Sequence, residues 1–489
     1  VAALEEAMEI MAERGTPVDL ANLPHDDPAV YEAAQRADTV GVFQIESRAQ
    51  MATLPSMKPR CFYDLVVEVG LIRPGPIVGK MVHPYLNRRA GREPVTYAHP
   101  SLKPILERTL GIPLFQEQLM RVAMVAANFS GGEAQELRRA MSHKRSRELM
   151  QRFEERLRNG MAKNGFKKEA AEEVITGIRS FAEYGFPESH AASFALLVYA
   201  SLWLKVHHPA VFLVALLNNQ PMGFYAPATL VKDAQRHGVR VRPPCVVVSE
   251  ARARVLGDRE VRLGLASVVG LGMRAAERIV SARRERPFAD VADLCLRAGL
   301  DLRRAEGLAE AGAFAALGLT RRQALWAVRA ALSGAGPLAP PPADESPLPE
   351  MNEWERTLAD YAATGLTVGP HLVGRLRPGL DARGIIPARA VPSRPNGSRI
   401  RIAGQVIVRQ RPGTAKGMVF LTLEDETGLA NAAVDPETFG KNRLTILRSP
   451  LLVIEGKLQN LEGVATVKGQ RFFPLDAAME DLPPSRDFR

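Results

Sequence analysis

A proline-rich stretch over residues 333–350 divides the chain into two regions with different hydrophobic periodicity. Ser333 to Pro349 holds six prolines together with glycine and alanine, a composition typical of an extended, poorly packed spacer. Beyond it, apolar residues alternate as in strands, whereas before it they mostly recur at helical spacing. We therefore expect several domains, mainly α first and β-rich last. The expected helices cover Val1–Arg14, Ala29–Ala37, Glu133–Asn159, Lys167–Phe181 and Ser193–Leu217.

The composition narrows the class of protein. The length of 489 residues suits about three domains. A net charge of +10 and a pI near 9.6 favour a nucleic-acid partner. Three widely spaced cysteines favour a reduced, cytoplasmic protein without disulfides or a cysteine metal site. The sequence lacks a long uncharged apolar run and a secretory signal, so we expect no membrane association. Because the chain begins with Val1, it is expected to be a fragment.

The region after the linker predicts a small β-barrel. Five short candidate strands with glycine turns lie within about 70 residues, and an OB-fold is the first choice. Its basic residues, among them Arg401 and Arg409, would suit single-stranded nucleic acid, although Phe420 is equally consistent with the barrel core. The strands are Ile400–Arg409, Met418–Glu424, Leu429–Val434, Leu451–Gln459 and Val464–Val467, and the other basic residues are Arg399, Arg411 and Lys416.

A helix-hairpin-helix is predicted around Gly270 and Gly272. Short strands at Ala253–Leu256 and Val261–Leu265 come first, and helices follow. Glycines in such a hairpin let backbone N–H groups approach a DNA phosphate, and Arg274 and Arg278 add charge without reading base sequence. A plain turn between two helices is the alternative. A dinucleotide site is not expected, because the third glycine and a full βαβ unit are missing.

Two segments of the first helical region are candidates for binding phosphate. From Ala134 to Lys168 the sequence has 11 Lys and Arg against 4 Glu, and Arg138 and Arg139 could grip a triphosphate through planar guanidinium groups. A solvated helix face explains the same charge equally well. Ser189 and His190 stand at the start of an apolar helix, where a phosphate could bind. On the alternative interpretation, Ser189 is an N-cap and His190 a packed interface residue.

The chain lacks the motifs that would place catalysis in it. Nucleotidyl transfer by two metal ions needs closely spaced carboxylates, and no Asp-x-Asp occurs anywhere in the sequence. A Walker A motif, zinc-ligand spacing and a Gly-x-Ser-x-Gly motif are also missing. We therefore expect neither a catalytic residue nor a metal ligand in this chain.

A series of short motifs runs across residues 1 to about 250. The motifs are Gly41–Arg48, Arg73–Pro76, Ser101–Leu106, Gly111–Gln118, Leu137–Met141, Tyr184–Phe186 with Ser189 and His190, and Trp203–Lys205 with His208 and Pro209. In order and spacing they resemble the bacterial C-family replicative polymerase, the DNA polymerase III alpha subunit. The hairpin and barrel continue the resemblance over nearly the whole chain.

Within that family the chain resembles the error-prone, damage-tolerant branch. The run Phe186–His190 differs from the replicative pattern, which has a basic residue before Ser-His. The chain ends soon after the barrel, and the linker contains no clamp-binding sequence of the Gln-x-x-Leu/Met-x-Phe type. In that branch, contact with the sliding clamp is thought to come through an accessory Y-family-like protein.

The resemblance implies a domain plan for the C-terminal part of such a polymerase. Residues 1–250 would be the fingers, 251–332 the helix-hairpin-helix duplex-binding domain, 333–350 the linker, 351–394 a connecting segment, 395–475 the OB-fold and 476–489 a tail. The palm aspartates that hold Mg²⁺ in the parent enzyme would lie outside this chain. The fragment alone should therefore bind DNA without extending a primer.

The resemblance also implies site residues and partners. The incoming dNTP would meet Arg138, Arg139, Arg73, Ser189 and His190. Template-primer DNA would meet the hairpin at Gly270, Gly272, Arg274 and Arg278, and the barrel at Arg401 and Arg409. Two alternatives stay open: a non-catalytic DNA-binding scaffold, and a piece of the replicative alpha subunit. A palm Asp-x-Asp in the upstream reading frame would favour the enzyme over the scaffold.

Overall fold

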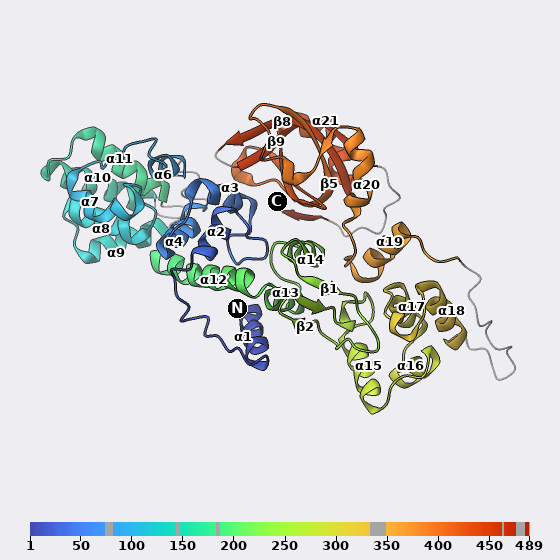
Figure 1. Cartoon of the computed structure of the whole chain (residues 1–489). Helices are drawn as coiled ribbons and strands as arrows, with labels where there is room; N and C mark the ends of the chain where they lie inside the picture. Colours follow the sequence, from blue (N-terminus) through green and yellow to red (C-terminus); the bar gives the residue numbers. More distant parts are fainter. Residues whose placement is uncertain are drawn as a thin grey trace. The chain divides into compact units, whose positions relative to one another are not determined.

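The chain forms two compact units, one made of Asp19–Val206 and the other of Val1–Val18 together with His207–Arg489. The structure, a computed structural model, describes residues 1–73, 82–142, 147–181, 186–332, 349–461, 464–475 and 485–488 (Figure 1). Most of the predicted linker, residues 333–348, lies outside the described residues. The same holds for residues 74–81, which follow Arg73.

The described part of the first unit is helical. Its first helix begins one residue before the expected Ala29, because Pro28 occupies the first turn and the Asp27 carboxylate accepts a hydrogen bond from the backbone N–H of Ala29. The elements are α2 (Pro28–Gln35), α3 (Arg48–Met57), α4 (Phe62–Leu71), α6 (Val82–Arg89), η1 (Pro100–Leu102), α7 (Lys103–Leu106), η2 (Glu107–Thr109), α8 (Gln116–Ala127), α9 (Gly131–Ser142), α10 (Arg147–Lys163), α11 (Lys168–Phe181) and α12 (Glu188–His207).

Two expected helices differ from the observed ones. The single helix expected over 193–217 is divided into α12 and α13 (Pro209–Asn218), because Pro209 has no backbone N–H to continue the ladder and instead starts a new helix. The helix expected over 133–159 corresponds to α9 and α10, and residues 143–146 between them lie outside the described residues. By length and composition alone α12 could span a membrane, but half of its apolar window is buried in the protein.

The second unit begins with helices around a small sheet. α1 (Ala2–Glu13), α13 and α14 (Pro227–Arg236) accompany β1 (Arg240–Arg242), β2 (Arg254–Gly257) and β3 (Glu260–Arg262). The order is β1-β3-β2, with β1 parallel and β2 antiparallel to β3. The strand expected over 261–265 therefore ends at Arg262, and Leu265 belongs to the short η3 (Leu265–Ser267).

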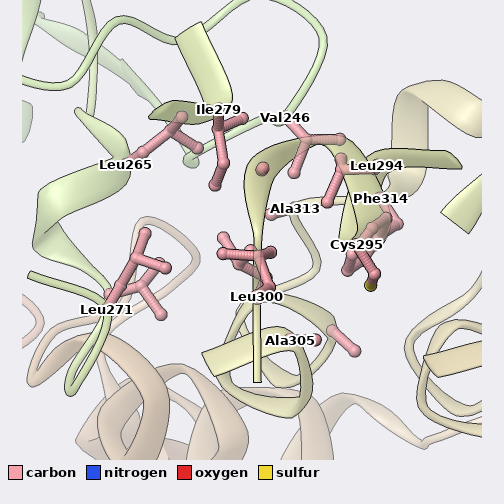
Figure 2. Packing of buried hydrophobic residues seen from close by; sticks show 14 of the residues in the cluster. Val246, Leu265, Leu271, Ile279, Leu294, Cys295, Leu300, Ala305, Ala313 and Phe314 are labelled. Carbon is pink, nitrogen blue, oxygen red and sulfur yellow. The ribbon is translucent and has the colours of Figure 1, made fainter. Parts of the chain in front are cut away.

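A cluster of helices with one apolar core follows the small sheet. Small and apolar residues at helical spacing face inward, such as Ala275, Ala276 and Ile279 of the first helix. Figure 2 shows Leu265, Ile279, Leu294 and Phe314 among the packed side chains; each fully buried leucine or isoleucine contributes ~1.5–3 kcal/mol. The helices are α15 (Met273–Glu285), α16 (Val291–Ala298), α17 (Leu302–Glu310), η4 (Ala315–Leu317), α18 (Arg321–Leu332) and α19 (Glu353–Thr364).

The predicted barrel is present and closed. Its strand order is β5-β6-β7-β9-β8, and β8 pairs back onto β5 to complete the ring. Ile402, Leu421, Leu423 and Ile454 are among the side chains that fill its core. The elements are α20 (Leu372–Ala382), β4 (Ile385–Ile386), η5 (Ala388–Ala390), β5 (Arg399–Gln410), η6 (Gly413–Ala415), β6 (Val419–Asp425), β7 (Gly428–Val434), α21 (Pro436–Arg448), β8 (Leu451–Leu461), β9 (Val464–Pro474) and β10 (Arg486–Phe488). β10 lies in the stretch expected to be only a tail, and it pairs with β5.

Candidate nucleotide and nucleic-acid interface

Arg73, predicted to bind the nucleotide, stands just after α4 and is fixed at two points. Its Nε donates a hydrogen bond to the backbone carbonyl of Val69 at 3.2 Å. Its guanidinium carbon lies 4.2 Å from the centre of the Phe186 ring and 5.9 Å from that of Phe194, which is cation–π geometry. Nη2 is buried and has no hydrogen-bond partner among the described residues. The side chain is thus held in place while a donor stays available.

His190 meets the same two aromatic rings. Its ring centroid lies 4.3 Å from that of Phe194 and 5.2 Å from that of Phe186. His190 and Ser189 are both exposed. The structure therefore brings Arg73 and His190 together through Phe186 and Phe194, which the sequence did not single out as site residues. Phe194 follows His190 by four positions, a spacing that places both on one face of α12.

The start of α12 is held in place by polar contacts with neighbouring elements. The Tyr63 hydroxyl donates to the Glu188 carboxylate at 2.8 Å, and the backbone N–H of Glu188 donates to Glu117 at 2.8 Å. The guanidinium carbon of Arg108 lies 3.6 Å from the centre of the Tyr63 ring. Because α12 begins at Glu188, Ser189 lies inside the first turn and is not the N-cap residue that the alternative interpretation required.

The motif around Gln118 has a structural explanation. The Gln118 side chain accepts hydrogen bonds from the backbone N–H groups of Leu114 and Phe115, and it donates to Thr109 at 2.9 Å. On α4, Glu68 is fully buried, and neither carboxylate oxygen has a hydrogen-bond partner among the described residues. Burial raises the pKa of Glu68 well above its usual range, which favours the neutral acid.

Arg138 and Arg139 lie on α9, a different element from those that carry the Arg73 cluster. Arg138 is half-buried, and its Nε donates to the side chain of Gln135 at 3.2 Å. Arg139 is exposed. The exposed position of Arg139 is compatible with contact to a triphosphate, whereas one donor of Arg138 is engaged with Gln135.

The hairpin before α15 has the backbone geometry that its glycines predict. Gly270 and Gly272 have φ values of +80° and +76°, a region that side chains with a Cβ rarely adopt. A Cβ on Gly272 would meet nothing within 4 Å, so its conformation alone calls for glycine. The element before the hairpin is only the single 3₁₀ turn η3, shorter than the expected helix.

The arginines near the hairpin differ in their exposure and in their hydrogen-bond partners. Arg274 is exposed at the start of α15. Arg278 donates to the backbone carbonyls of Ala298 at 2.8 Å and Gly299 at 3.2 Å, so it mainly joins α15 to the end of α16. Arg303, which the sequence analysis did not select, is exposed, and its Nε lies 4.0 Å from where a Cβ of Gly270 would stand. Only the folded chain brings Arg303 to the hairpin, because it lies 33 residues further along.

The two predicted barrel arginines have opposite environments. The Arg401 side chain is 50% exposed and donates to Glu455 at 2.9 Å. Arg409 is buried and donates to the backbone carbonyls of Ile446 at 2.9 Å and Ser449 at 3.1 Å, and also to Ser485. Burial lowers the pKa of Arg409. Arg409 therefore connects β5 to the end of α21 inside the protein, and it is not part of the exposed surface that could contact DNA.

Comparison with known proteins agrees with this architecture. Residues 1–165 match the bacterial DNA polymerase III alpha subunit finger domain, and residues 238–324 match the helix-hairpin-helix motif. An error-prone DNA polymerase of Mycolicibacterium paratuberculosis is 49% identical over 500 residues, which cover 100% of this chain and 45% of that protein. One of Dechloromonas aromatica is 48% identical over 493 residues, covering 100% of this chain and 48% of that protein.

The chain thus spans about half the length of the curated relatives it matches. Among solved structures, asparaginyl-tRNA synthetase from Pyrococcus horikoshii matches 20% of this chain and 23% of its own chain, with 28% identity and a TM-score of 0.17. That score is too low to indicate a shared fold. The resemblance found in the sequence is confirmed: over its whole length this chain is similar to a part of proteins named error-prone DNA polymerases, and its residues 1–165 match the finger domain of the bacterial DNA polymerase III alpha subunit.

Proposed function

We propose that this chain is the C-terminal part of an error-prone DNA polymerase that copies damaged templates. The observation that carries the proposal is the 49% identity over the full chain to proteins named error-prone DNA polymerases. The succession of finger domain, helix-hairpin-helix and closed barrel supports it. The proposal includes the domain plan given above: fingers over 1–250, helix-hairpin-helix domain over 251–332, linker over 333–350, connecting segment over 351–394, OB-fold over 395–475 and tail over 476–489.

In the proposed fingers, the chain binds and orients the incoming dNTP. Phosphoryl transfer gains mainly from positioning and from neutralising charge. Arg73 is held by Val69 and the Phe186 ring with Nη2 still a donor. The exposed His190 packs on the same ring, and the exposed Ser189 precedes it in the chain. Arg139 and Arg138 on α9 complete the set of groups proposed to meet the triphosphate. These residues hold the nucleotide, and none of them takes or gives a proton in the proposal.

Mg²⁺ is the metal expected for a polymerase, and the residues that the structure describes within each compact unit do not fit a site for it. Within either compact unit, the described residues bring no three Asp, Glu, His or Cys side chains together in a group that could hold an ion. The fully buried Glu68 is shielded from solvent and favoured as the neutral acid. We therefore assign Mg²⁺ binding to carboxylates outside this chain and derive no step through the metal here.

The remaining regions are proposed to hold template-primer DNA in the cytoplasm. The hairpin offers backbone N–H groups at Gly270 and Gly272, with Arg274 and Arg303 beside it. Arg278 is exposed as well and is kept in the proposed interface, although its Nε also donates to the Ala298 carbonyl. Such contacts suit the phosphates of a duplex. The barrel is proposed to meet single-stranded template. An accessory Y-family-like protein is proposed to connect the enzyme to the sliding clamp.

Primer extension tests the proposal directly. The complete enzyme with Mg²⁺ and four dNTPs should extend a primer on both an intact and a lesion-bearing template. Chain 1–489 alone should bind the same DNA with an affinity that falls with salt, without extending it. A complete protein that binds DNA but never extends a primer would contradict the proposal, and extension by chain 1–489 alone would refute the assignment of catalysis to another region.

Nucleotide binding is tested by replacing Arg138 with alanine in the complete enzyme. We expect a higher KM for dNTP and a lower kcat, because the contact should strengthen as negative charge develops during transfer. Arg121→Ala, on an exposed position of α8, is the matched control. If Arg138→Ala leaves both kinetic constants unchanged, Arg138 does not belong to the nucleotide site.

Duplex binding is tested by replacing Gly272 with valine. The positive φ disfavours valine, so the hairpin should change shape and duplex affinity should fall about tenfold. The dNTP KM should stay the same. Gly15→Val is the control, since Gly15 also has a positive φ of 77° and open space around it. Equal duplex affinity for wild type and Gly272→Val would remove the hairpin from the DNA interface.

A further inference from the structure

Helices α8 and α12 begin next to each other and exchange hydrogen bonds at their first residues. The backbone N–H of Gln116, the first residue of α8, donates to the carbonyl of Phe186 at 3.2 Å. The backbone N–H of Glu188, the first residue of α12, donates to the Glu117 carboxylate at 2.8 Å. The first N–H groups of a helix have no acceptor within that helix, so each segment supplies an acceptor for the other. The start of α12 is thereby fixed to the start of α8.

Two further elements hold the side chain of Glu188. From α4, the Tyr63 hydroxyl donates to the Glu188 carboxylate at 2.8 Å. From η2, Nη1 of Arg108 lies 3.9 Å from the same carboxylate oxygen, and the Arg108 guanidinium carbon lies 3.6 Å from the centre of the Tyr63 ring. Burial and the hydrogen bond to Glu188 raise the pKa of Tyr63, so its hydroxyl stays protonated as the donor. Four elements thus meet at the residue that precedes Ser189 and His190.

The charge in this group of side chains is negative. Glu117 and Glu188 bring two carboxylates, and Arg108, which is 64% exposed, brings one guanidinium. A helix N-terminus attracts anions through its free N–H groups and its dipole. At α12, however, the Glu117 carboxylate accepts the N–H of Glu188. A phosphate would have to displace that carboxylate and approach a second one, so this helix start is closed to it.

We propose that Tyr63, Glu117 and Glu188 are positioning residues of the nucleotide site. They hold the first turn of α12 so that its exposed side chains meet the nucleotide in one orientation, and they keep phosphates away from the helix N-terminus. The triphosphate is thereby directed to guanidinium groups, of which Arg73 is fixed on an aromatic ring. The inference rests on the proposed function, because it takes the first unit to bind dNTP. None of the three residues contacts the nucleotide, so none is a catalytic residue.

Steady-state primer extension by the complete enzyme tests the contact between Tyr63 and Glu188. Tyr63→Phe removes only the hydroxyl and should raise the KM for dNTP about fivefold, with kcat changed by less than about twofold, because the lost orientation affects binding before and during transfer alike. Glu188→Ala should have the same effect. The double variant Tyr63→Phe/Glu188→Ala should be no worse than either single variant, since both remove one contact. Glu188→Gln keeps an acceptor for the hydroxyl and should keep the KM within about twofold of wild type.

Tyr97→Phe is the matched control, because Tyr97 is a half-buried tyrosine of the same unit. It should leave the KM unchanged. A wild-type KM in Tyr63→Phe, additive effects in the double variant, or a KM in Glu188→Gln as high as in Glu188→Ala would overturn the pair. Primer extension by the wild type is measured first: its absence contradicts the proposed polymerase activity, whereas an active wild type with an unchanged KM in Tyr63→Phe contradicts only the positioning role.

Inhibition of extension by inorganic tripolyphosphate tests whether Glu117 closes the start of α12. Glu117→Ala frees the N–H of Glu188, so tripolyphosphate should inhibit about fivefold more strongly. The KM for dNTP should rise about fivefold at the same time, because α12 is less well fixed. These two changes have opposite directions, whereas a merely damaged site would raise both the KM and the inhibition constant.

Glu107→Ala is the matched control for this charge, because it removes an exposed carboxylate next to Arg108. It should leave both constants within about twofold of wild type, since Glu107 is not among the residues that hold the start of α12. An inhibition constant that is unchanged or higher in Glu117→Ala would overturn the role of Glu117. An equal gain of inhibition in Glu107→Ala would overturn it as well, because general charge and not the helix start would then be responsible.

Discussion

The two halves of strand β5 show how one strand can serve both a surface and a core. In the first half, Arg401 stands opposite Glu455 and points out of the barrel. In the second half, Arg409 stands opposite Leu421, which is a fully buried core residue. The two arginines are eight residues apart, and strict alternation would place them on the same face. Instead, one is half exposed and the other is buried.

A β-bulge accounts for the difference. The register of β5 against β6 shifts between Val406 and Val408, and one extra residue on a strand inverts the facing of every later residue. Arg409 therefore reaches the core side, where the last turn of α21 offers the Ile446 carbonyl and the following Ser449 offers its own. The comparison teaches that positive charge in a strand indicates a binding surface only where the register leaves the side chain outside.

Replacing Arg409 should change the stability of the barrel more than any other substitution in β5 that is considered below. Arg409→Met leaves the buried Ile446 and Ser449 carbonyls without this donor, so the barrel should lose roughly 2–4 kcal/mol of stability. Arg401→Met, on the exposed half, should change stability by less than about 1 kcal/mol. Hydrogen exchange of peptides from β5, β6 and α21 measures the local stability. Similar protection in both variants would show that the two halves of β5 do not differ as described.

Replacing Arg401 should change DNA binding more than stability. Arg401→Gln removes one phosphate contact, so we expect about fivefold weaker binding of oligo(dT) and a salt slope lower by about 0.7. It also leaves Glu455 less compensated, and the double variant Arg401→Gln/Glu455→Gln separates the two causes. The double variant should regain part of the affinity. Full recovery would mean that Arg401 only masks Glu455 and does not contact DNA.

The barrel strands could be predicted from the sequence, but which side of the sheet each arginine occupies could not. The five expected strands correspond to β5 to β9 because apolar alternation is strong and glycine turns mark the ends. The bulge leaves no mark in the composition of the run around Ile407. The short strand β10, which pairs with the second half of β5, comes from a distant polar stretch. The burial of Arg409 depends on the bulge and on the segment that carries β10, so its structural role could not be predicted from the sequence.

The candidate nucleotide and hairpin sites show the same limit. The sequence selected Arg73 and His190 by motif, and the structure places both on the rings of Phe186 and Phe194. It also selected Arg278, whose Nε and Nη2 donate to backbone carbonyls at the end of the next helix. Local patterns identify elements and charges, whereas the partner that each charge finds depends on contacts between distant residues.

The smallest expected effect concerns the protonation of Glu455. The hydrogen bond from Arg401, with the charges of Arg471 and Arg399, lowers the pKa of Glu455. The ion pair therefore contributes to stability above the ordinary pKa of glutamate, about 4.3, and the contribution disappears as pH falls through the lower folded-state value. Protonation removes the negative charge that lies among Arg399, Arg401 and Arg471, so oligo(dT) affinity should rise slightly over the same range.

Arg401→Gln makes this effect visible. Without the Arg401 hydrogen bond, the pKa of Glu455 should return toward its ordinary value, so the small rise in oligo(dT) affinity should occur at a higher pH than in the wild type. Glu455→Gln should abolish the rise altogether, and Arg409→Met should leave its midpoint in place, because Arg409 lies on the other half of β5. If the midpoint of this rise is the same in the wild type and in Arg401→Gln, Arg401 does not control the protonation of Glu455. The exposed half of β5 would then not have the electrostatic role proposed for it.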